Sequence, residues 1–128
     1  MKKKILKAGI IGSGFAAAFH YEALLRVYGV NVEIAGVYSS TPQKLQQFAG
    51  SRNIKAFGSL EELINGVDIV HVCTPPVTHE PIVVAALNQN KYVIVEKPFT
   101  GYFGDGSEGF NGDRFPKSKG LEAALGSI

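Results

Sequence analysis

Short apolar runs rich in β-branched residues alternate along this chain with segments whose apolar residues have helical spacing. A nearly continuous apolar run is typical of a strand buried on both faces of a parallel sheet. Five such strands are predicted, at residues 5–11, 32–38, 54–57, 68–73 and 92–95. Because helical segments separate them, the pattern indicates an α/β fold with one doubly wound parallel sheet in a single domain.

The segments between the strands carry helix-start signals. Thr41 followed by Pro42 is typical of an N-cap and a first helical position, and predicts a helix to about residue 49. Ser59 with Glu62 three residues later is a capping-box pattern for a short helix. Further helices are predicted at 15–28 and 78–90. The expected buried face of the first one consists of Phe15, Ala18, Phe19 and Leu25.

The chain changes character after residue 98. Seven of its fifteen glycines fall within residues 101–128, too densely at first for a helix or strand interior. We therefore divide the chain into a domain at 1–100, a glycine-rich loop at 101–117 and, at 118–128, the start of a helix. That helix would lead to a substrate domain that the sequence lacks. Two roles stay open for the loop's aromatic residues, a lid over a substrate or anchors on the domain: Tyr102, Phe103, Phe110 and Phe115.

Charge and composition argue against several classes of protein. The net charge of +2 depends on four lysines within the first seven residues, and the remainder carries nine basic and eleven acidic groups. Without a basic stripe we expect no nucleic-acid binding. Lys7 and nearby glycines interrupt the apolar start, which argues against a signal peptide, and no apolar run reaches the ~18 residues that cross a bilayer. The single cysteine, Cys73, suits a reducing compartment, so we expect a cytoplasmic protein without a membrane partner.

The clearest motif follows the first predicted strand. Gly12, Gly14 and Ala17 have the spacing of a dinucleotide-binding loop that opens a helix. Gly12 would allow a tight turn, and Gly14 would let the backbone approach a diphosphate, which the free N–H groups and the positive end of the helix would hold. The alternatives are a turn without a ligand, or an adenosine-binding variant such as a methyltransferase.

The end of the second predicted strand bears on which dinucleotide is bound. Chains that prefer NAD commonly carry an acidic residue there, which hydrogen-bonds the ribose 2′-hydroxyl. Ser39 and Ser40 stand at this position instead, and Lys44 follows. Hydroxyl groups accept a 2′-phosphate that a carboxylate would repel, so the sequence favours NADP over NAD.

Two more motifs are expected at the carboxyl edge of the sheet, where open α/β folds bind ligands. Pro75 and Pro76 end the fourth strand and place Thr74 at that edge. The fifth strand delivers Glu96 and Lys97 to the same edge. An ammonium there could polarise a carbonyl or help to shift a hydroxyl proton.

Together these motifs resemble the N-terminal NAD(P)-binding Rossmann domain of the Gfo/Idh/MocA oxidoreductases, the glucose-fructose oxidoreductase and inositol dehydrogenase family. The resemblance covers residues 5–98 and rests mainly on Thr74-Pro75 with His79 following, and on Glu96-Lys97-Pro98. It implies hydride transfer between a nicotinamide and the hydroxyl or carbonyl carbon of a sugar- or polyol-like substrate. It also implies a catalytic Lys97, a cis bond before Pro98 and a homo-oligomer at full length.

The residues expected to contact the dinucleotide are Gly12, Ser13, Gly14, Phe15, Ala16, Ser39, Ser40, Lys44, Cys73, Thr74, Pro75, Pro76, His79, Glu96 and Lys97. We expect no metal site, because three histidines at these spacings do not form one. His71 is expected to pack in the core and His20 to be structural. For His79, packing at a helix start and a polar contact in the cleft both stay open, and Glu96 is also a candidate ion-pair partner of Lys97.

Two departures from the family pattern matter. The second domain of the family is absent, so we expect this chain alone to be inactive. A glycine-rich insertion also follows residue 98, where the family continues into a helix. A non-catalytic module that senses a dinucleotide is therefore the alternative function. The motif that contains Lys97 argues against it, since pure sensing needs no lysine at the nicotinamide.

Overall fold

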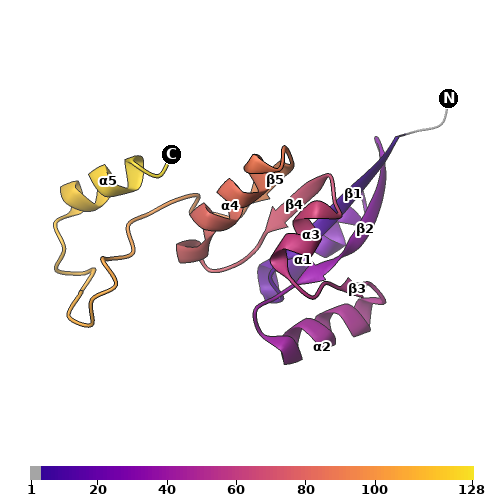
Figure 1. The fold of residues 1–128 in the computed structure, drawn as a ribbon, viewed down its shortest axis with the longest axis horizontal. Helices are drawn as coiled ribbons and strands as arrows, with labels where there is room; N and C mark the ends of the chain where they lie inside the picture. The colour runs from indigo at the N-terminus through magenta and orange to yellow at the C-terminus, as the bar shows by residue number, and fades with distance from the viewer. Residues whose placement is uncertain (1–3) are drawn as a thin grey trace.

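In the computed structural model, which describes residues 4–128, the strands form one parallel sheet in the order β3-β2-β1-β4-β5 (Figure 1). The doubly wound Rossmann-type fold is therefore confirmed, with β1 in the middle. The strands are β1 (Ile5–Ile11), β2 (Asn31–Tyr38), β3 (Lys55–Ala56), β4 (Ile69–Val72) and β5 (Tyr92–Val95). Lys2 and Lys3, two of the four lysines that account for the basic excess, lie outside the described residues.

Helices cover both faces of this sheet and bury two separate apolar cores. On one face, α1 (Phe15–Leu24) and α2 (Pro42–Arg52) bury Ile10 and Val37. On the other face, α3 (Leu60–Asn65) and α4 (His79–Asn88) bury Ile11, Val70 and Val72. A short 3-10 turn, η1 (Pro76–Thr78), precedes α4. Successive residues of β1 thus enter different cores, which explains why the strand is apolar without alternation.

The prediction for the first helix was wrong in its length and in its buried face. The helix ends at Leu24 rather than near residue 28, and Ala17 is its buried residue. Phe15, Phe19 and Leu25 are 80%, 61% and 56% exposed. Phe19 lines an open groove beside Ile69 and Ile94, because α1 packs on β1, β2 and β4 while no helix in the described part of the chain covers β5 on this face. Side chains that a further layer would bury are therefore left at the surface.

The helix-start signals are largely confirmed. Pro42 occupies the first turn of α2, although the Thr41 side chain makes no capping hydrogen bond, and α2 continues to Arg52. At α3, the Glu62 N–H donates to Ser59 Oγ at 3.1 Å. The Glu62 carboxylate in turn accepts from the Gly58 N–H at 3.2 Å. The short helix thus begins where the capping pattern indicates.

The segment after β5 leaves the sheet and carries α5 (Lys117–Leu125) beyond α4 (Figure 1). The rings of Tyr102, Phe110 and Phe115 pack on one another, with centroids 4.9 to 5.6 Å apart. These three rings therefore form a cluster within the segment itself rather than anchors spread over the domain. Phe103 is 47% exposed. No helix among the described residues is long and apolar enough to cross a membrane.

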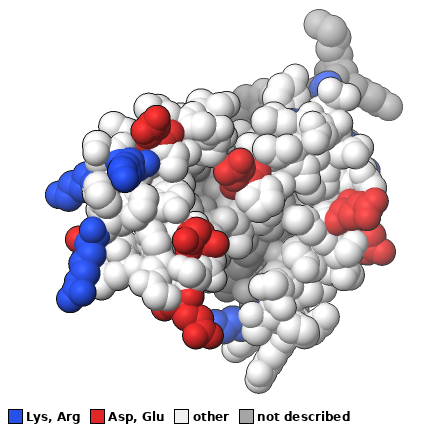
Figure 2. All heavy atoms as spheres, turned by 60° about the vertical axis from the view of Figure 1, so that its left-hand side comes forward, with Lys and Arg blue, Asp and Glu red and all other residues white. Residues whose placement is uncertain are grey.

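Charged side chains do not form a broad basic surface on the face shown in Figure 2. Acidic and basic groups are interspersed there, with the basic ones toward the edges rather than in a stripe. This agrees with the charge pattern of the sequence, in which the basic excess is confined to the first seven residues.

Candidate dinucleotide-binding cleft

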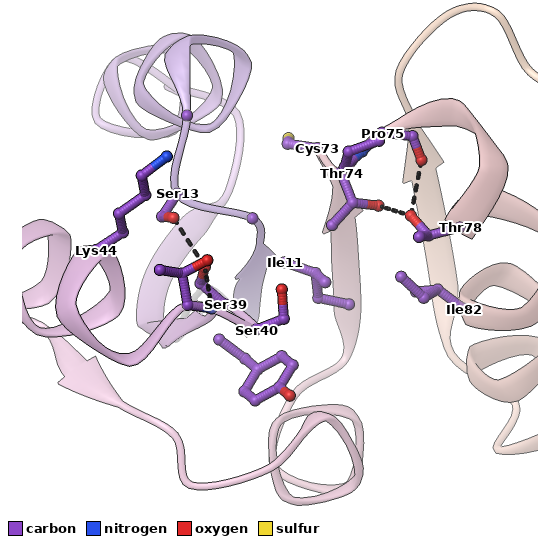
Figure 3. Close-up of a pocket in the computed structure, with 14 residues that line it drawn as sticks. Ile11, Ser13, Ser39, Ser40, Lys44, Cys73, Thr74, Pro75, Thr78 and Ile82 are labelled. Carbon is purple, nitrogen blue, oxygen red and sulfur yellow. Dashed lines mark hydrogen bonds between the residues drawn. The ribbon is translucent and has the colours of Figure 1, made fainter.

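A cleft of about 520 Å³ opens at the carboxyl edge of the sheet, between the ends of β1, β2 and β4 (Figure 3). One wall consists of the loop after β1, the end of β2 and the start of α2. The other consists of the end of β4, the turn η1 and the start of α4. This is the position where the topology reverses direction, and where open α/β sheets bind ligands.

Gly12 fits the loop tightly between β2 and β4. Its φ is +116°, a backbone conformation that residues with a side chain rarely adopt. A Cβ atom at this position would stand 2.5 Å from the carbonyl oxygen of Cys73. The Gly12 N–H donates to the carbonyl of Tyr38 at 2.8 Å, and the Cys73 N–H donates to the carbonyl of Ile11 at 2.8 Å. The turn therefore needs glycine for structural reasons.

Gly14 has a different environment. It is the N-cap of α1 with an extended backbone, and a Cβ atom there would meet nothing within 4 Å. Glycine at this position thus keeps a space open beside the backbone. The first N–H groups of α1, at Phe15 and Ala16, have no carbonyl partner inside the helix. An open space beside a helix N-terminus suits a diphosphate.

The end of β2 contributes hydroxyl groups to the same wall. Ser13 Oγ and Ser39 Oγ are hydrogen-bonded at 2.8 Å, which connects the glycine loop to β2. Ser40 and Lys44 also line the cleft, and the Lys44 side chain extends from α2 toward the loop (Figure 3). No carboxylate lines this cleft among the described residues.

On the opposite wall, Thr74 and Pro75 follow β4 and are held by Thr78. Thr78 Oγ1 lies 2.6 Å from Thr74 Oγ1 and 2.7 Å from the carbonyl oxygen of Pro75 (Figure 3). Burial and the negative charge of Glu96 raise the pKa of the Cys73 thiol to about 12. Cys73 is therefore a protonated, half-buried wall residue and not a nucleophile.

His79 connects this wall to the segment that follows β5. The side chain is 1% exposed, its Nε2 lies 2.9 Å from the carbonyl oxygen of Thr74, and its Nδ1 lies 3.0 Å from the carbonyl oxygen of Pro98. His79 is thus packed at the start of α4, and its polar contacts are with two backbone carbonyls; it does not itself line the cleft. It thereby connects the backbone at Pro98, which follows the exposed Lys97, to the end of β4. The Lys97–Pro98 bond is cis, as the resemblance implies.

Glu96 points away from the cleft. Its carboxylate accepts a hydrogen bond from His20 Nε2 at 2.7 Å and makes no ion pair with Lys97. The pKa of Glu96 is lowered, first by this hydrogen bond and then by the positive charges of His20 and Lys97, against an opposing effect of desolvation. His71 is buried, in line with the expected core position, and its Nδ1 contacts His20. The contacts of His20 with His71 and Glu96 fit the structural role expected of it.

The structure brings nine of the fifteen expected contact residues into one cleft: Gly12, Ser13, Gly14, Ser39, Ser40, Lys44, Cys73, Thr74 and Pro75. The other six do not line it: Phe15, Ala16, Pro76, His79, Glu96 and Lys97. Phe15 and Pro76 are next in sequence to lining residues, and His79 contacts the carbonyl of Thr74. Five further residues line it and were not expected: Ile11, Tyr38, Thr41, Thr78 and Ile82. The only signal for most of them was a position close to a predicted motif. The described residues contain no group of three or more side chains suited to a metal ion.

The family model for the Gfo/Idh/MocA oxidoreductases, described as an oxidoreductase family with an NAD-binding Rossmann fold, matches residues 6–110. The chain belongs to the Gfo/Idh/MocA oxidoreductase family. Among curated relatives of this Gfo/Idh/MocA domain is glucose-6-phosphate 3-dehydrogenase of Bacillus subtilis. It is 35% identical over 92 residues, which are 72% of this chain and 26% of the relative.

Solved structures share the fold of this Gfo/Idh/MocA domain. GenD2 from gentamicin A biosynthesis, in complex with NAD, has a TM-score of 0.69 at 28% identity over 75% of this chain and 28% of its own. Biliverdin reductase from Synechocystis sp. PCC 6803, in complex with biliverdin and NADP⁺, has a TM-score of 0.67 at 26% identity over 73% and 30%. The chain spans between 26% and 32% of the length of the first curated relatives.

Proposed function

We propose that the cleft binds a nicotinamide dinucleotide with its diphosphate at Gly12, Ser13, Gly14, Phe15 and Ala16. The observation that carries this proposal is the open space at Gly14, beside unpartnered N–H groups of α1 and inside a cleft at the carboxyl edge of the sheet. When bound, the nicotinamide ring supplies a site that donates or accepts hydride. Thr74, Pro75 and Pro76 would bound the opposite side of the ligand.

We further infer that the cleft prefers NADP to NAD. Ser39, Ser40 and Lys44 supply two hydroxyl groups and an ammonium at the end of β2, and a carboxylate that would repel a 2′-phosphate is missing from the described lining. The relatives alone do not decide this, because one solved neighbour contains NAD and another NADP⁺. The proposed preference therefore depends on the residues of this cleft.

The test of this assignment is a titration of the ¹⁵N-labelled chain with NADPH and with NADH, followed by amide shifts. We expect saturable shifts at the glycine loop and at the end of β2, with tighter binding of NADPH. Lys44→Ala should weaken NADPH binding about tenfold and leave NADH binding nearly unchanged, since one charge-assisted contact contributes about 1.5 kcal/mol. Equal losses for both dinucleotides would contradict the preference for NADP.

For the full-length protein we propose an NAD(P)-dependent oxidoreductase that acts on the CH–OH group of a sugar- or polyol-like substrate. The Bacillus relative is a sugar-phosphate dehydrogenase by name, which supports this class. Lys97 is exposed just after the end of β5, at the carboxyl edge of the sheet, where its ammonium would hold the substrate oxygen or move a proton at it. This chain spans at most 32% of the first curated relatives, so we expect catalysis to need groups besides those of this cleft.

The role of Lys97 is tested by Lys97→Ala in the full-length protein. We expect the hydride-transfer rate to fall by at least about 100-fold, as is typical when a group that assists proton transfer is removed, while NADPH affinity changes little. An unchanged rate would remove Lys97 from the mechanism. We also propose that the full-length protein is a homo-oligomer and that it is cytoplasmic. The location is supported by the one cysteine, which is unpaired and half-buried and so suits a reducing compartment.

A further inference from the structure

Three titratable side chains from different elements form a hydrogen-bonded chain on the α1 side of the sheet. His71 comes from β4, His20 from α1, and Glu96 follows β5. The Nδ1 atoms of the two histidines are 2.9 Å apart, and His20 Nε2 lies 2.7 Å from the Glu96 carboxylate. The two imidazole rings meet edge to face, with centroids 5.2 Å apart. The proposed dinucleotide site does not use this chain of contacts.

The hydrogen bonds restrict where the protons of His20 can be. The Glu96 carboxylate can only accept, because its pKa is lowered and it is ionised near neutral pH. His20 Nε2 therefore carries a proton. Between the two Nδ1 atoms one proton must be shared, since a hydrogen bond needs one donor and one acceptor. Either ring can supply that proton.

His71 stays neutral under these conditions. It is 6% exposed, and burial together with the charge of His20 lowers its pKa to about 4. A neutral imidazole has one N–H group and one bare nitrogen, and the two can exchange places. His71 can therefore donate from Nδ1 when His20 is neutral, and accept at Nδ1 when His20 is an imidazolium.

We propose that His20 positions the Glu96 carboxylate and that tautomer exchange in His71 keeps this arrangement intact in both charge states of His20. When the pair takes up a proton, the proton binds Nε2 of His71, and the Nδ1 proton of His71 passes to Nδ1 of His20. One proton enters, one moves, and no heavy atom needs to change place. The structure gives a hydrogen-bond partner to His71 Nδ1 but not to Nε2. Since every fully buried side-chain nitrogen among the described residues has a partner, His71 Nε2 is not fully buried and can take up a proton.

The neighbouring groups are compatible with this arrangement. Cys73, which directly follows β4, remains a neutral thiol. Lys97 adds a positive charge that helps to keep Glu96 ionised. On α1, Glu22 is engaged by Arg26 at 2.8 Å and is not a competitor for His20. The wall of the adjoining groove is otherwise apolar, with Leu6, Phe19, Ala23, Val27, Ile69 and Ile94.

The consequence concerns Lys97. Glu96 is its nearest carboxylate in sequence, yet the described residues contain two ion pairs, His20 with Glu96 and Arg26 with Glu22. Because His20 holds Glu96 on the α1 side, the Lys97 ammonium keeps no internal partner and stays available. This functional meaning rests on the proposed oxidoreductase role, whereas the proton arrangement does not.

The test uses the chain without any dinucleotide. Long-range ¹H–¹⁵N spectra of the ¹⁵N-histidine-labelled chain report which ring nitrogen carries the proton, between about pH 5 and pH 8.5. We expect His71 to stay neutral while its own proton moves from Nδ1 to Nε2 as the pair of histidines takes up one proton. One fixed His71 tautomer throughout would overturn the proposal, whatever the outcome of dinucleotide titrations.

A pair of variants tests the positioning of Glu96. His20→Phe keeps an aromatic ring but removes the donor, so the pKa of Glu96 should rise toward its ordinary range, as measured by ¹³C shifts of its carboxyl group. Arg26→Gln removes the other ion pair of α1 and should leave the Glu96 titration unchanged. An unchanged Glu96 in folded His20→Phe would contradict the positioning role. If His20→Phe does not fold, the tautomer measurement on the unmodified chain still decides.

Discussion

Two glycines in the loop after β1 are predicted to respond in opposite ways to the same substitution. We expect Gly12 to be required by the fold and Gly14 by the proposed ligand. A Cβ atom at Gly12 would stand 2.5 Å from the carbonyl oxygen of Cys73, but at Gly14 it would meet nothing within 4 Å. Alanine therefore probes structure at one position and the proposed diphosphate contact at the other.

The cost of Gly12→Ala has two sources. A non-glycine residue at a φ of +116° is strained by about 1–3 kcal/mol. The close approach is to backbone rather than to a flexible side chain, so β1 and β4 must separate locally, which costs about another 1–2 kcal/mol. We expect a total loss of about 2–5 kcal/mol from the free energy of unfolding. For a domain with a stability of about 5–15 kcal/mol, that is a large fraction.

Gly14→Ala is the matched control for stability. Alanine is a slightly poorer N-cap than glycine, so its free energy of unfolding should fall by less than about 1 kcal/mol. The added methyl group, however, occupies the space proposed for the diphosphate, and NADPH affinity should fall at least tenfold.

Urea unfolding and calorimetric titration separate the two effects. Gly12→Ala should lower the unfolding midpoint strongly, and Gly14→Ala should weaken NADPH binding without a comparable loss of stability. Equal destabilisation by both substitutions, or wild-type NADPH affinity in Gly14→Ala, would refute the different roles assigned to these glycines.

Further predictions concern stability. Because His71 has a pKa of about 4 when folded and an ordinary value of 6.5 when unfolded, the unfolded chain binds more protons between these values. Stability should be nearly fully present above about pH 7.5 and fall by about 2 kcal/mol between about pH 7.5 and pH 5, and His71→Phe should remove most of this slope in urea titrations. Ser59→Ala deletes a capping bond and should cost about 1 kcal/mol, whereas Thr41→Ala, which removes no such bond, should cost less in the same assay.

The strand pattern could be predicted well because burial on both sheet faces leaves a strong local signal. The limits of β1 and β5 agree with the prediction, and the others differ at their ends. The Ser59 cap was also predictable, because its hydrogen bond joins residues three apart. Features set by neighbours in sequence were thus accessible without coordinates.

The contacts of His20 could not be predicted in the same way. Its partners lie 51 and 76 residues away, and which face of α1 is buried depends on which elements cover the sheet. The same cause explains the exposure of Phe19, since helical spacing alone does not reveal that β5 lacks a covering helix on that side. His79 was ambiguous because its two carbonyl partners belong to separate motifs.

The central claim is that the cleft at the carboxyl edge binds a nicotinamide dinucleotide, and isothermal titration calorimetry of the chain with NADPH and NADH tests it most directly. The account predicts that each chain binds one dinucleotide. NADPH and NADH should both bind, and NADPH should bind more tightly. If neither NADPH nor NADH binds up to about millimolar concentration, which corresponds to a binding free energy near −4 kcal/mol, the claim is contradicted.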